Sequence, residues 1–85
     1  MRETLDESES IRVRCRASHK GDQKPLEVEL DGVWEEVSTI AEEWLVQDHR
    51  GRRRCFRIVL SSGRRLIIGR DYSTDRWSLE GIWTV

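Results

Sequence analysis

Runs of alternating apolar and charged residues, separated by turn residues, constrain this chain more than any other feature of its sequence. Residues 11–16 read Ile-Arg-Val-Arg-Cys-Arg, and residues 26–30 read Leu-Glu-Val-Glu-Leu. Because successive side chains of a β-strand point to opposite faces, this period of two predicts strands with apolar residues facing a core and charged residues facing water. Asp31-Gly32 follows the second run and favours the tight turn of a β-hairpin.

The C-terminal half predicts three further strands, over residues 55–60, 65–70 and 77–83, with turns at residues 61–63 and 71–75. Gly69 predicts a bulge or a close approach of another group to the backbone. We expect Trp77, Leu79 and Trp83 to share one face of the last strand. Short strands joined by hairpin turns predict an all-β fold, either a small SH3-like barrel or a strongly bent antiparallel sheet of five to six strands.

Residues 33–46 leave two alternatives open. Their apolar residues recur at three- and four-residue spacing, the period of a helix, and Thr39 with Glu42 forms a capping box. This interpretation gives an α+β fold with a helix at about residues 34–46. Against it, an Asp-Gly turn needs a second strand, and a bulge that adds one residue to a long bent strand produces the same spacing. We favour the strand.

The chain has 85 residues, enough for one domain with a small core. Residues 1–10 are acidic and Ser-rich and predict a disordered lead-in, so we expect residues 11–85 to form a single small β domain. No apolar run is long enough to cross a bilayer, and the N-terminus lacks the apolar stretch of a signal peptide. We therefore expect a cytoplasmic protein without a membrane partner, present as a monomer or a weak homodimer.

Four tryptophans must contribute much of the core, because hydrophobic residues make up only 36% of the chain. We expect Trp34, Trp44 and Trp77 to be mostly buried. Trp83 lies near the C-terminus and should be partly exposed. The alternative is that the tryptophans form a ligand cage or a stacking platform.

Charge is divided unevenly along the sequence. Residues 1–49 hold 6 Lys/Arg and 13 Asp/Glu, a net charge of −7, whereas residues 50–85 hold 9 Arg and 3 Asp/Glu, a net charge of +6. Such an asymmetry indicates charged partners rather than a fold. Arginines near an exposed Tyr72 or Trp77 would suit single-stranded nucleic acid. The candidate nucleic-acid-binding residues are Arg50, Arg52, Arg53, Arg54, Arg57, Arg64 and Arg65.

The acidic half supports a competing hypothesis, a protein-interaction adaptor that makes no contact with nucleic acid. Complementary charge raises the association rate and sets the register of such a contact. In a plainer interpretation, the same carboxylates pair with the arginines and form an ordinary charged surface. The candidate residues of the acidic face are Glu27, Glu29, Glu35 and Glu36.

Metal binding and catalysis find little support in the sequence. Cys15-x3-His19 and His49-x5-Cys55 make a nominal Cys2His2 set, but both cysteines lie in predicted strands, where free Cys behaves as a small hydrophobe. No arrangement of nucleophile, base and orienting group stands out, and no Gly-rich phosphate loop is present. We therefore expect a binding module that is not an enzyme and uses no metal or cofactor.

Two segments resemble a known family. Residues 25–44 contain a strand, then Asp31-Gly32-Val33-Trp34, and then Val37, Ile40 and Trp44; the second segment runs from Gly69 to Trp83. Together they resemble a small bacterial domain of unknown function, found alone or beside and fused to Y-family, translesion polymerase-like proteins. The resemblance implies an accessory of DNA repair or translesion synthesis, with single-stranded DNA or a DNA-repair protein as its partner. The resemblance assigns no catalytic residue to this chain.

Overall fold

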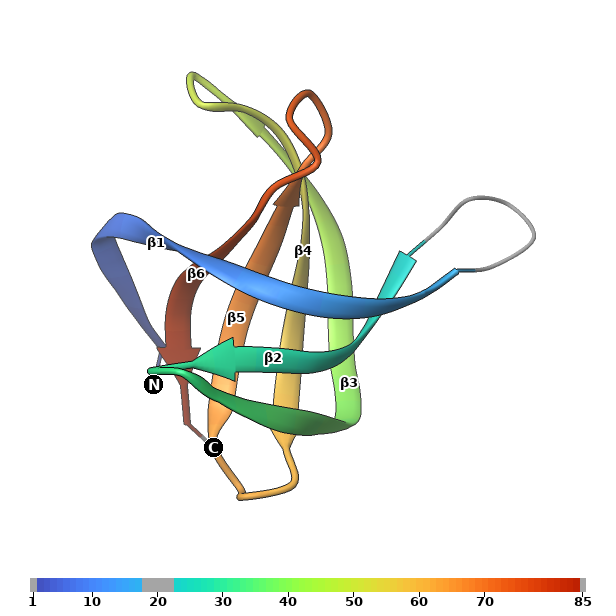
Figure 1. Ribbon diagram of the computed structural model, residues 1–85. Coiled ribbons are helices and arrows are strands. Elements are labelled where there is room, and N and C mark those ends of the chain that lie inside the picture. The colour runs from blue at the N-terminus through green and yellow to red at the C-terminus, as the bar shows by residue number, and fades with distance from the viewer. Residues whose placement is uncertain (1, 18–22, 85) are drawn as a thin grey trace.

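A computed structural model describes residues 2–17 and 23–84, with side chains described for residues 9–16 and 23–84. Over these residues the chain forms a closed barrel of six antiparallel strands in sequence order (Figure 1). The strands are β1 (Arg2–Ala17), β2 (Gln23–Leu30), β3 (Val33–Asp48), β4 (Gly51–Leu60), β5 (Arg65–Asp71) and β6 (Trp77–Trp83). This arrangement confirms the predicted all-β small barrel. The described part of the chain contains no helix that is long and apolar enough to cross a membrane.

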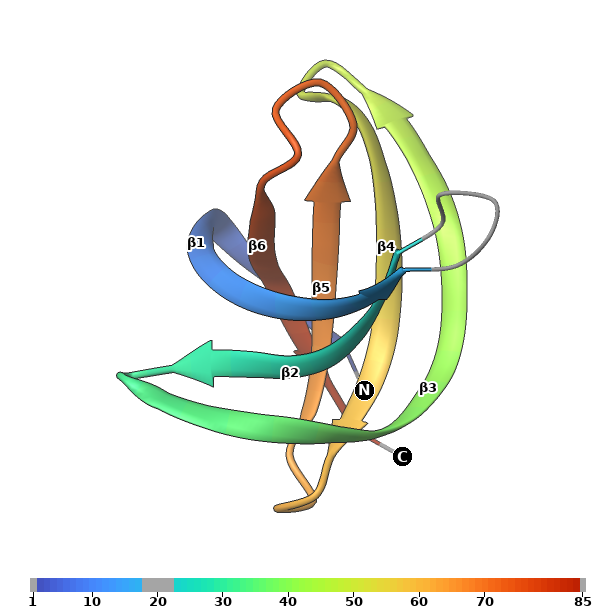
Figure 2. The same ribbon diagram turned by 45° about the vertical axis from the view of Figure 1, so that its right-hand side comes forward.

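Two long strands, β1 and β3, are each shared between two sheets. Residues 12–17 of β1 pair with β2, while residues 2–11 contain its pairs with β6 and close the barrel. Residues 33–36 of β3 pair with β2, and its pairs with β4 lie within residues 37–48. Both strands bend strongly, so that β2 lies across β4 and β5 (Figure 2). The core lies between these two layers.

Strand β3 settles the alternative left open for residues 33–46, and the helix is wrong. The pairing of β3 with β4 shifts register twice, between Val37 and Thr39 and between Ile40 and Glu42. Each shift leaves one extra residue on β3, which is the property of a β-bulge. The extra residues stretch the two-residue alternation to a three-residue spacing that imitates a helix.

The hairpin turn between β2 and β3 has the predicted geometry. Asp31 and Gly32 both have positive φ, of 51° and 80°, and Leu30 pairs directly with Val33. Positive φ at both central residues is the mark of a type I′ turn, whose twist matches that of the flanking strands.

Aliphatic residues and one phenylalanine form the centre of the core. Phe56 and Ile58 are fully buried, and the ring of Phe56 packs against Trp77 with 5.5 Å between centroids. The predicted alternation in β1 is confirmed, with the apolar residues packed on the core and the arginines exposed. In β2, Leu26 is 44% exposed, contrary to expectation, because the register with β1 shifts at this point and leaves Leu26 unpaired.

The tryptophans follow the predicted degree of burial. Trp77 is buried and Trp83 is half-buried, as expected. Trp34 and Trp44 are mostly buried, as predicted, but less completely than Trp77. Trp34 shares its side of the sheet with its cross-strand partner Glu29, and Trp44 is paired with Cys55 outside the main core cluster.

The sequence predicts that Trp83 shares a face with Trp77, and this prediction is wrong. Ile67 pairs with Gly81 and Ile68 pairs with Leu79, so Glu80 is an extra residue in β6. This bulge reverses the alternation and turns Trp83 to the outer face. The predicted close approach at Gly69 is confirmed, because a Cβ there would lie 3.2 Å from Cγ of Glu80.

The structure also differs from the prediction for residues 2–10, which belong to β1 rather than to a disordered lead-in. Arg2 pairs with Trp83 and Thr4 pairs with Gly81. The physical reason is that ladder hydrogen bonds come from the backbone, so an acidic composition does not prevent pairing with the free edge that β6 offers. Met1 and residues 18–22 lie outside the described residues.

Replacing Gly32 by Ala should lower the free energy of unfolding by about 1 kcal/mol, because a Cβ is strained at positive φ. No neighbouring atom lies within 4 Å of the added Cβ, so the loss reports backbone strain alone. Gly32→Asn should lose less, since Asn tolerates left-handed backbone better. Urea unfolding followed by tryptophan fluorescence measures both; equal midpoints for Gly32→Ala and the wild type would contradict the assigned turn.

Candidate nucleic-acid interface

The arginine-rich segment before Phe56 belongs to a strand, because β4 begins at Gly51, earlier than the strand predicted over residues 55–60. Consecutive residues of a strand point to opposite faces. Arg53 therefore shares the outer face of the barrel with Cys55 and Arg57, while Arg52 and Arg54 point to the other side. The predicted arginines do not form one continuous surface, and three different environments divide them.

The first environment is a buried ion cluster around Arg53, which is only 6% exposed. Nε of Arg53 donates to Oε1 of Glu80 at 3.0 Å, and its two terminal nitrogens donate to the carboxylate of Asp48 at 3.0 and 3.3 Å. Nη2 of Arg50 lies 3.6 Å from Oε1 of Glu80. Because Arg53 is buried and paired with two carboxylates, removing one of them would leave part of its buried charge uncompensated, and Arg53 is not accessible to a phosphate.

The pKa of Asp48 is lowered by its contacts within this cluster. Hydrogen bonds from the Arg53 side chain and from the backbone N–H of Arg50 lower the pKa of Asp48 to about 2. Both donors bind the ionised form, which explains the direction of the change.

The second environment consists of exposed or half-buried arginines that pair with carboxylates. Nη1 of Arg54 donates to Oε2 of Glu43 at 2.9 Å, and Lys24 pairs with the other oxygen of the same carboxylate. The hydrogen bond from Lys24, followed by that from Arg54, lowers the pKa of Glu43. Nη1 of Arg64 donates to Oε2 of Glu35 at 3.0 Å.

The third environment contains the remaining candidates, Arg52, Arg57 and Arg65. None of them forms an ion pair with a carboxylate of a described side chain, and each lies against an aromatic ring. Cζ of Arg52 lies 5.8 Å from the ring centroid of Tyr72. Cζ of Arg57 and of Arg65 lie 4.6 and 5.2 Å from that of Trp83. The candidates without a carboxylate partner are therefore those that stack on aromatic rings.

We call Trp83, Arg57 and Arg65 the Trp83 cluster. Trp83 belongs to β6, and Nε1 of its indole donates to the backbone oxygen of Ile58 on β4 at 3.1 Å. Because β5 lies between β4 and β6, the indole lies across the outer face of β5. Nε of Arg57 and Nε of Arg65 are buried without a hydrogen-bond partner among the described residues. Glu42 is the cross-strand partner of Arg57 but forms no hydrogen bond with it. Within the described side chains, the cluster is a hydrogen-bonded ring flanked by two guanidinium groups that form no ion pair.

We call Tyr72, Arg52, Arg54 and Arg70 the Tyr72 cluster. Nε of Arg54 donates to the hydroxyl of Tyr72 at 2.9 Å, and Cζ of Arg70 lies 5.6 Å from its ring centroid. The ring is 41% exposed, as the sequence hypothesis requires, whereas Trp77, the other aromatic residue considered for stacking, is buried. Arg70 also binds Asp75, with Nε donating at 2.6 Å.

Two loops hold the Tyr72 cluster at one end of the barrel. The backbone N–H of Tyr72 donates to the backbone oxygen of Arg52 at 3.0 Å and ties the β5–β6 turn to the start of β4. Within the turn, Oδ1 of Asp71 accepts hydrogen bonds from the backbone N–H groups of Ser73 and Thr74. Figure 1 shows the β3–β4 and β5–β6 turns at the same end of the barrel. The exposed ring of Tyr72 is therefore held at the barrel's rim.

The acidic face predicted from the sequence is largely neutralised. Arg12 binds both carboxylate oxygens of Glu29, at 2.6 and 3.2 Å, and Arg14 binds Glu27 at 3.3 Å. Glu35 accepts from Arg64, as described above. Among the described residues, Glu36 is the one member of the predicted face that is exposed and has no assigned partner.

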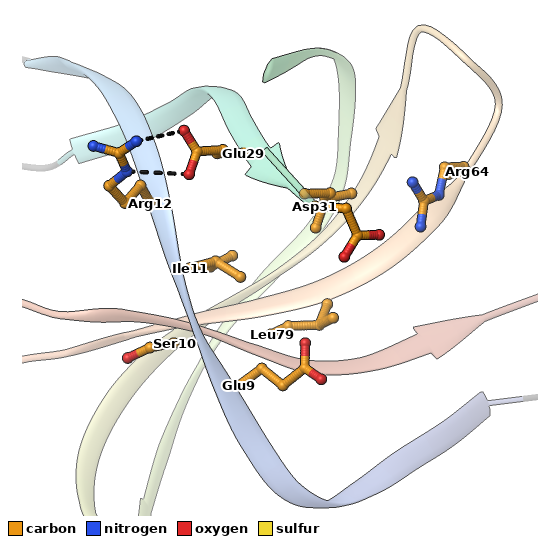
Figure 3. Close-up of a pocket in the computed structure, with 9 residues that line it drawn as sticks. Glu9, Ser10, Ile11, Arg12, Glu29, Asp31, Arg64 and Leu79 are labelled. Carbon is orange, nitrogen blue, oxygen red and sulfur yellow. Dashed lines mark hydrogen bonds and ion pairs between the residues drawn. The ribbon is translucent and has the colours of Figure 1, made fainter. Parts of the chain in front are cut away.

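A pocket of about 590 Å³ opens where β1 leaves β2 to pair with β6. Ile11 and Leu79 line it, and the Arg12–Glu29 ion pair lies at its edge (Figure 3). Its second guanidinium belongs to Arg64, which Glu35 already neutralises. The pocket therefore offers no uncompensated cation to an anionic ligand and gathers few of the predicted site residues.

The nominal zinc set is not assembled in the described part of the chain, where no three potential ligands come together. Cys15 packs against the core, whereas Cys55 lies on the outer face. Burial raises the pKa of both thiols, so they stay protonated at neutral pH and are poor ligands and nucleophiles. His19 lies outside the described residues.

Comparisons of this chain with family models, with curated proteins and with solved structures found no match. The resemblance to a domain found beside translesion polymerase-like proteins thus stays a prediction from the sequence. The case for a function depends on the geometry of the two aromatic clusters.

Asp48→Asn should lower the thermal stability at neutral pH, because it weakens the ion cluster around Arg53. The folded-state pKa of Asp48, about 2, lies below the model value of 3.8, so its contribution is present above pH 3.8 and is lost as the pH falls toward 2. The melting temperatures of Asp48→Asn and the wild type should therefore converge over this range. A difference that stays constant down to the lowest pH at which both fold would contradict this assignment.

Proposed function

We propose that this protein is a non-enzymatic binding module for single-stranded nucleic acid. Its contacts are Arg52, Arg57 and Arg65 together with the rings of Tyr72 and Trp83. The observation that carries the proposal is the coincidence of two properties in the same three arginines. Each lacks a carboxylate partner among the described side chains, and each lies against a partly exposed aromatic ring.

Single strands are bound by this combination of groups. Guanidinium groups neutralise phosphates, and aromatic rings stack on bases without regard to sequence. Arg57 and Arg65 are partly exposed, so their guanidinium groups can reach a phosphate although the Nε atoms are buried. An arginine already paired with a carboxylate must break that pair before it binds a phosphate. This cost argues against Arg53, Arg54 and Arg64 as contacts.

A single strand fits these clusters better than a duplex does. Bases within a duplex are stacked on one another, so their faces are not available to Tyr72 or Trp83. The net charge of the chain is −1, which provides no long-range attraction to a polyanion. We therefore expect moderate affinity that comes from local contacts. A role as an accessory of DNA repair or translesion synthesis follows from the sequence resemblance and is part of the proposal.

The alternative is a protein-interaction adaptor that uses the acidic face. Ion pairs with Arg12, Arg14 and Arg64 compensate Glu29, Glu27 and Glu35. An acidic surface that recognises a basic partner needs carboxylates without such partners. The adaptor is therefore the weaker candidate.

Binding of a labelled oligothymidylate, measured by fluorescence anisotropy, tests the proposal. Three uncompensated arginines predict a slope of about −2 for log affinity against log salt, or a roughly 15-fold loss between about 50 and 200 mM salt. The variant Arg52→Gln/Arg57→Gln/Arg65→Gln should lose at least about 10-fold in affinity at the lower salt and most of the salt dependence.

The matched control is Arg12→Gln/Arg14→Gln/Arg64→Gln, which has the same net charge but removes arginines that pair with carboxylates. It should retain the wild-type affinity to within about 2-fold. Thermal melting verifies that both variants are folded. Equal losses of affinity in the two variants would mean that net charge alone explains the binding, and would contradict the assigned contacts. Absence of binding by the wild type at the lower salt would overturn the proposed function.

A further inference from the structure

We infer that the Trp83 cluster and the Tyr72 cluster bind one strand simultaneously, so that the ligand is a single strand long enough to join them. This inference rests on the proposed function and specifies the length of the ligand. The two clusters are separate in the structure, and neither contains more than a few charges. Their separation sets the shortest strand that reaches both.

The length of β5 gives the separation. Arg65, of the Trp83 cluster, is the first residue of β5, and Tyr72 directly follows its last residue, Asp71. Seven residues at about 3.3 Å each extend over about 20 Å. Figures 1 and 2 both show β5 running from the end of the barrel near the C-terminus to the opposite end. The clusters therefore lie near opposite ends of the same strand.

The surface between the clusters has little to bind a phosphate. On the outer face it contains Cys55 and Gly69, both buried, and the side chain of Glu80 lies over Gly69. The charge of Glu80 is compensated by Arg53 and Arg50. A strand that crosses this region gains contacts mainly at the two ends. The arginines that contact the ring of Tyr72 point to the opposite face of the sheet from the Trp83 cluster. A strand on the outer face therefore reaches Tyr72 by passing over the β5–β6 turn at the rim.

Two weak contacts joined by one ligand give a defined dependence on length. Once the first cluster is occupied, the second meets a base at an effective concentration in the millimolar range, provided that the strand spans the gap. At the stacked spacing of about 3.4 Å per nucleotide, the length of β5, about 20 Å, corresponds to about six nucleotides, and the path over the rim adds to this length. Shorter strands can occupy only one cluster at a time.

The experiment is an anisotropy titration with oligothymidylates of about 3, 6, 9 and 12 nucleotides at about 50 mM salt. The wild type should show a step of at least about 10-fold in affinity between about 3 and 9 nucleotides. Two variants each remove one cluster. Tyr72→Leu removes the exposed ring, and Arg57→Gln/Arg65→Gln removes both cations while leaving Trp83 in place, because its indole covers β5.

Each variant should lose the step and bind long strands about as weakly as short ones. The control variant Arg12→Gln/Arg14→Gln also removes two arginines that stack on a tryptophan, Trp34, but these two arginines are paired with carboxylates. The control variant should therefore keep the step in affinity. Long strands offer more binding registers, but this statistical gain is the same for every variant and does not obscure the comparison.

The outcomes separate this inference from the proposed function. Binding of all lengths with similar affinity, or a step that persists in either single-cluster variant, would overturn simultaneous binding while leaving a single-stranded nucleic-acid module in place. No binding of any length at the lower salt would overturn both. A step in the wild type and the control that both cluster variants lose supports the inference.

Discussion

The arrangement of the barrel surface depends on where the β-ladders gain an extra residue. Alternation along a strand assigns every side chain to the core or to the outer face, and each bulge reverses that assignment for all residues beyond it. The extra Glu80 in β6 turns Trp83 outward, where it meets Arg57 and Arg65. Two shifts in β3 similarly bend a strand long enough to serve both layers of the barrel. Without the shift in β6, the indole would face the core and the Trp83 cluster would not exist.

Ion pairing then sorts arginines that composition alone treats as equivalent. Arg52, Arg53 and Arg54 are adjacent in the sequence, yet one stacks on Tyr72, one is buried between Asp48 and Glu80, and one binds Glu43. The buried pair connects β4 to β6 across β5 and stabilises the outer face near the rim. The partners of these arginines come from distant parts of the chain, so only a minority of the guanidinium groups keeps charge available for a ligand.

The Trp83 cluster is costly for stability taken alone. A buried N–H donor without an acceptor costs roughly 1–3 kcal/mol, and the cluster contains two. Two like charges beside one ring also repel each other, which the attraction of each cation to the indole offsets only in part. An anion that bridges the two guanidiniums would offset their mutual repulsion. This is the physical reason to regard the cluster as a binding surface rather than as ordinary packing.

Local chemistry in the sequence determined much of the fold. The alternation of β1, the Asp31-Gly32 turn and the all-β class follow from side-chain period and backbone preference, which act within a few residues. The basic segment could also be predicted in this way. Sequence reasoning could not predict the outward position of Trp83, the pairing of residues 2–10 with β6, or the division of the arginines. Each depends on register between strands far apart in the chain, where a shift of one residue exchanges the two faces, and only the closed barrel decides that register.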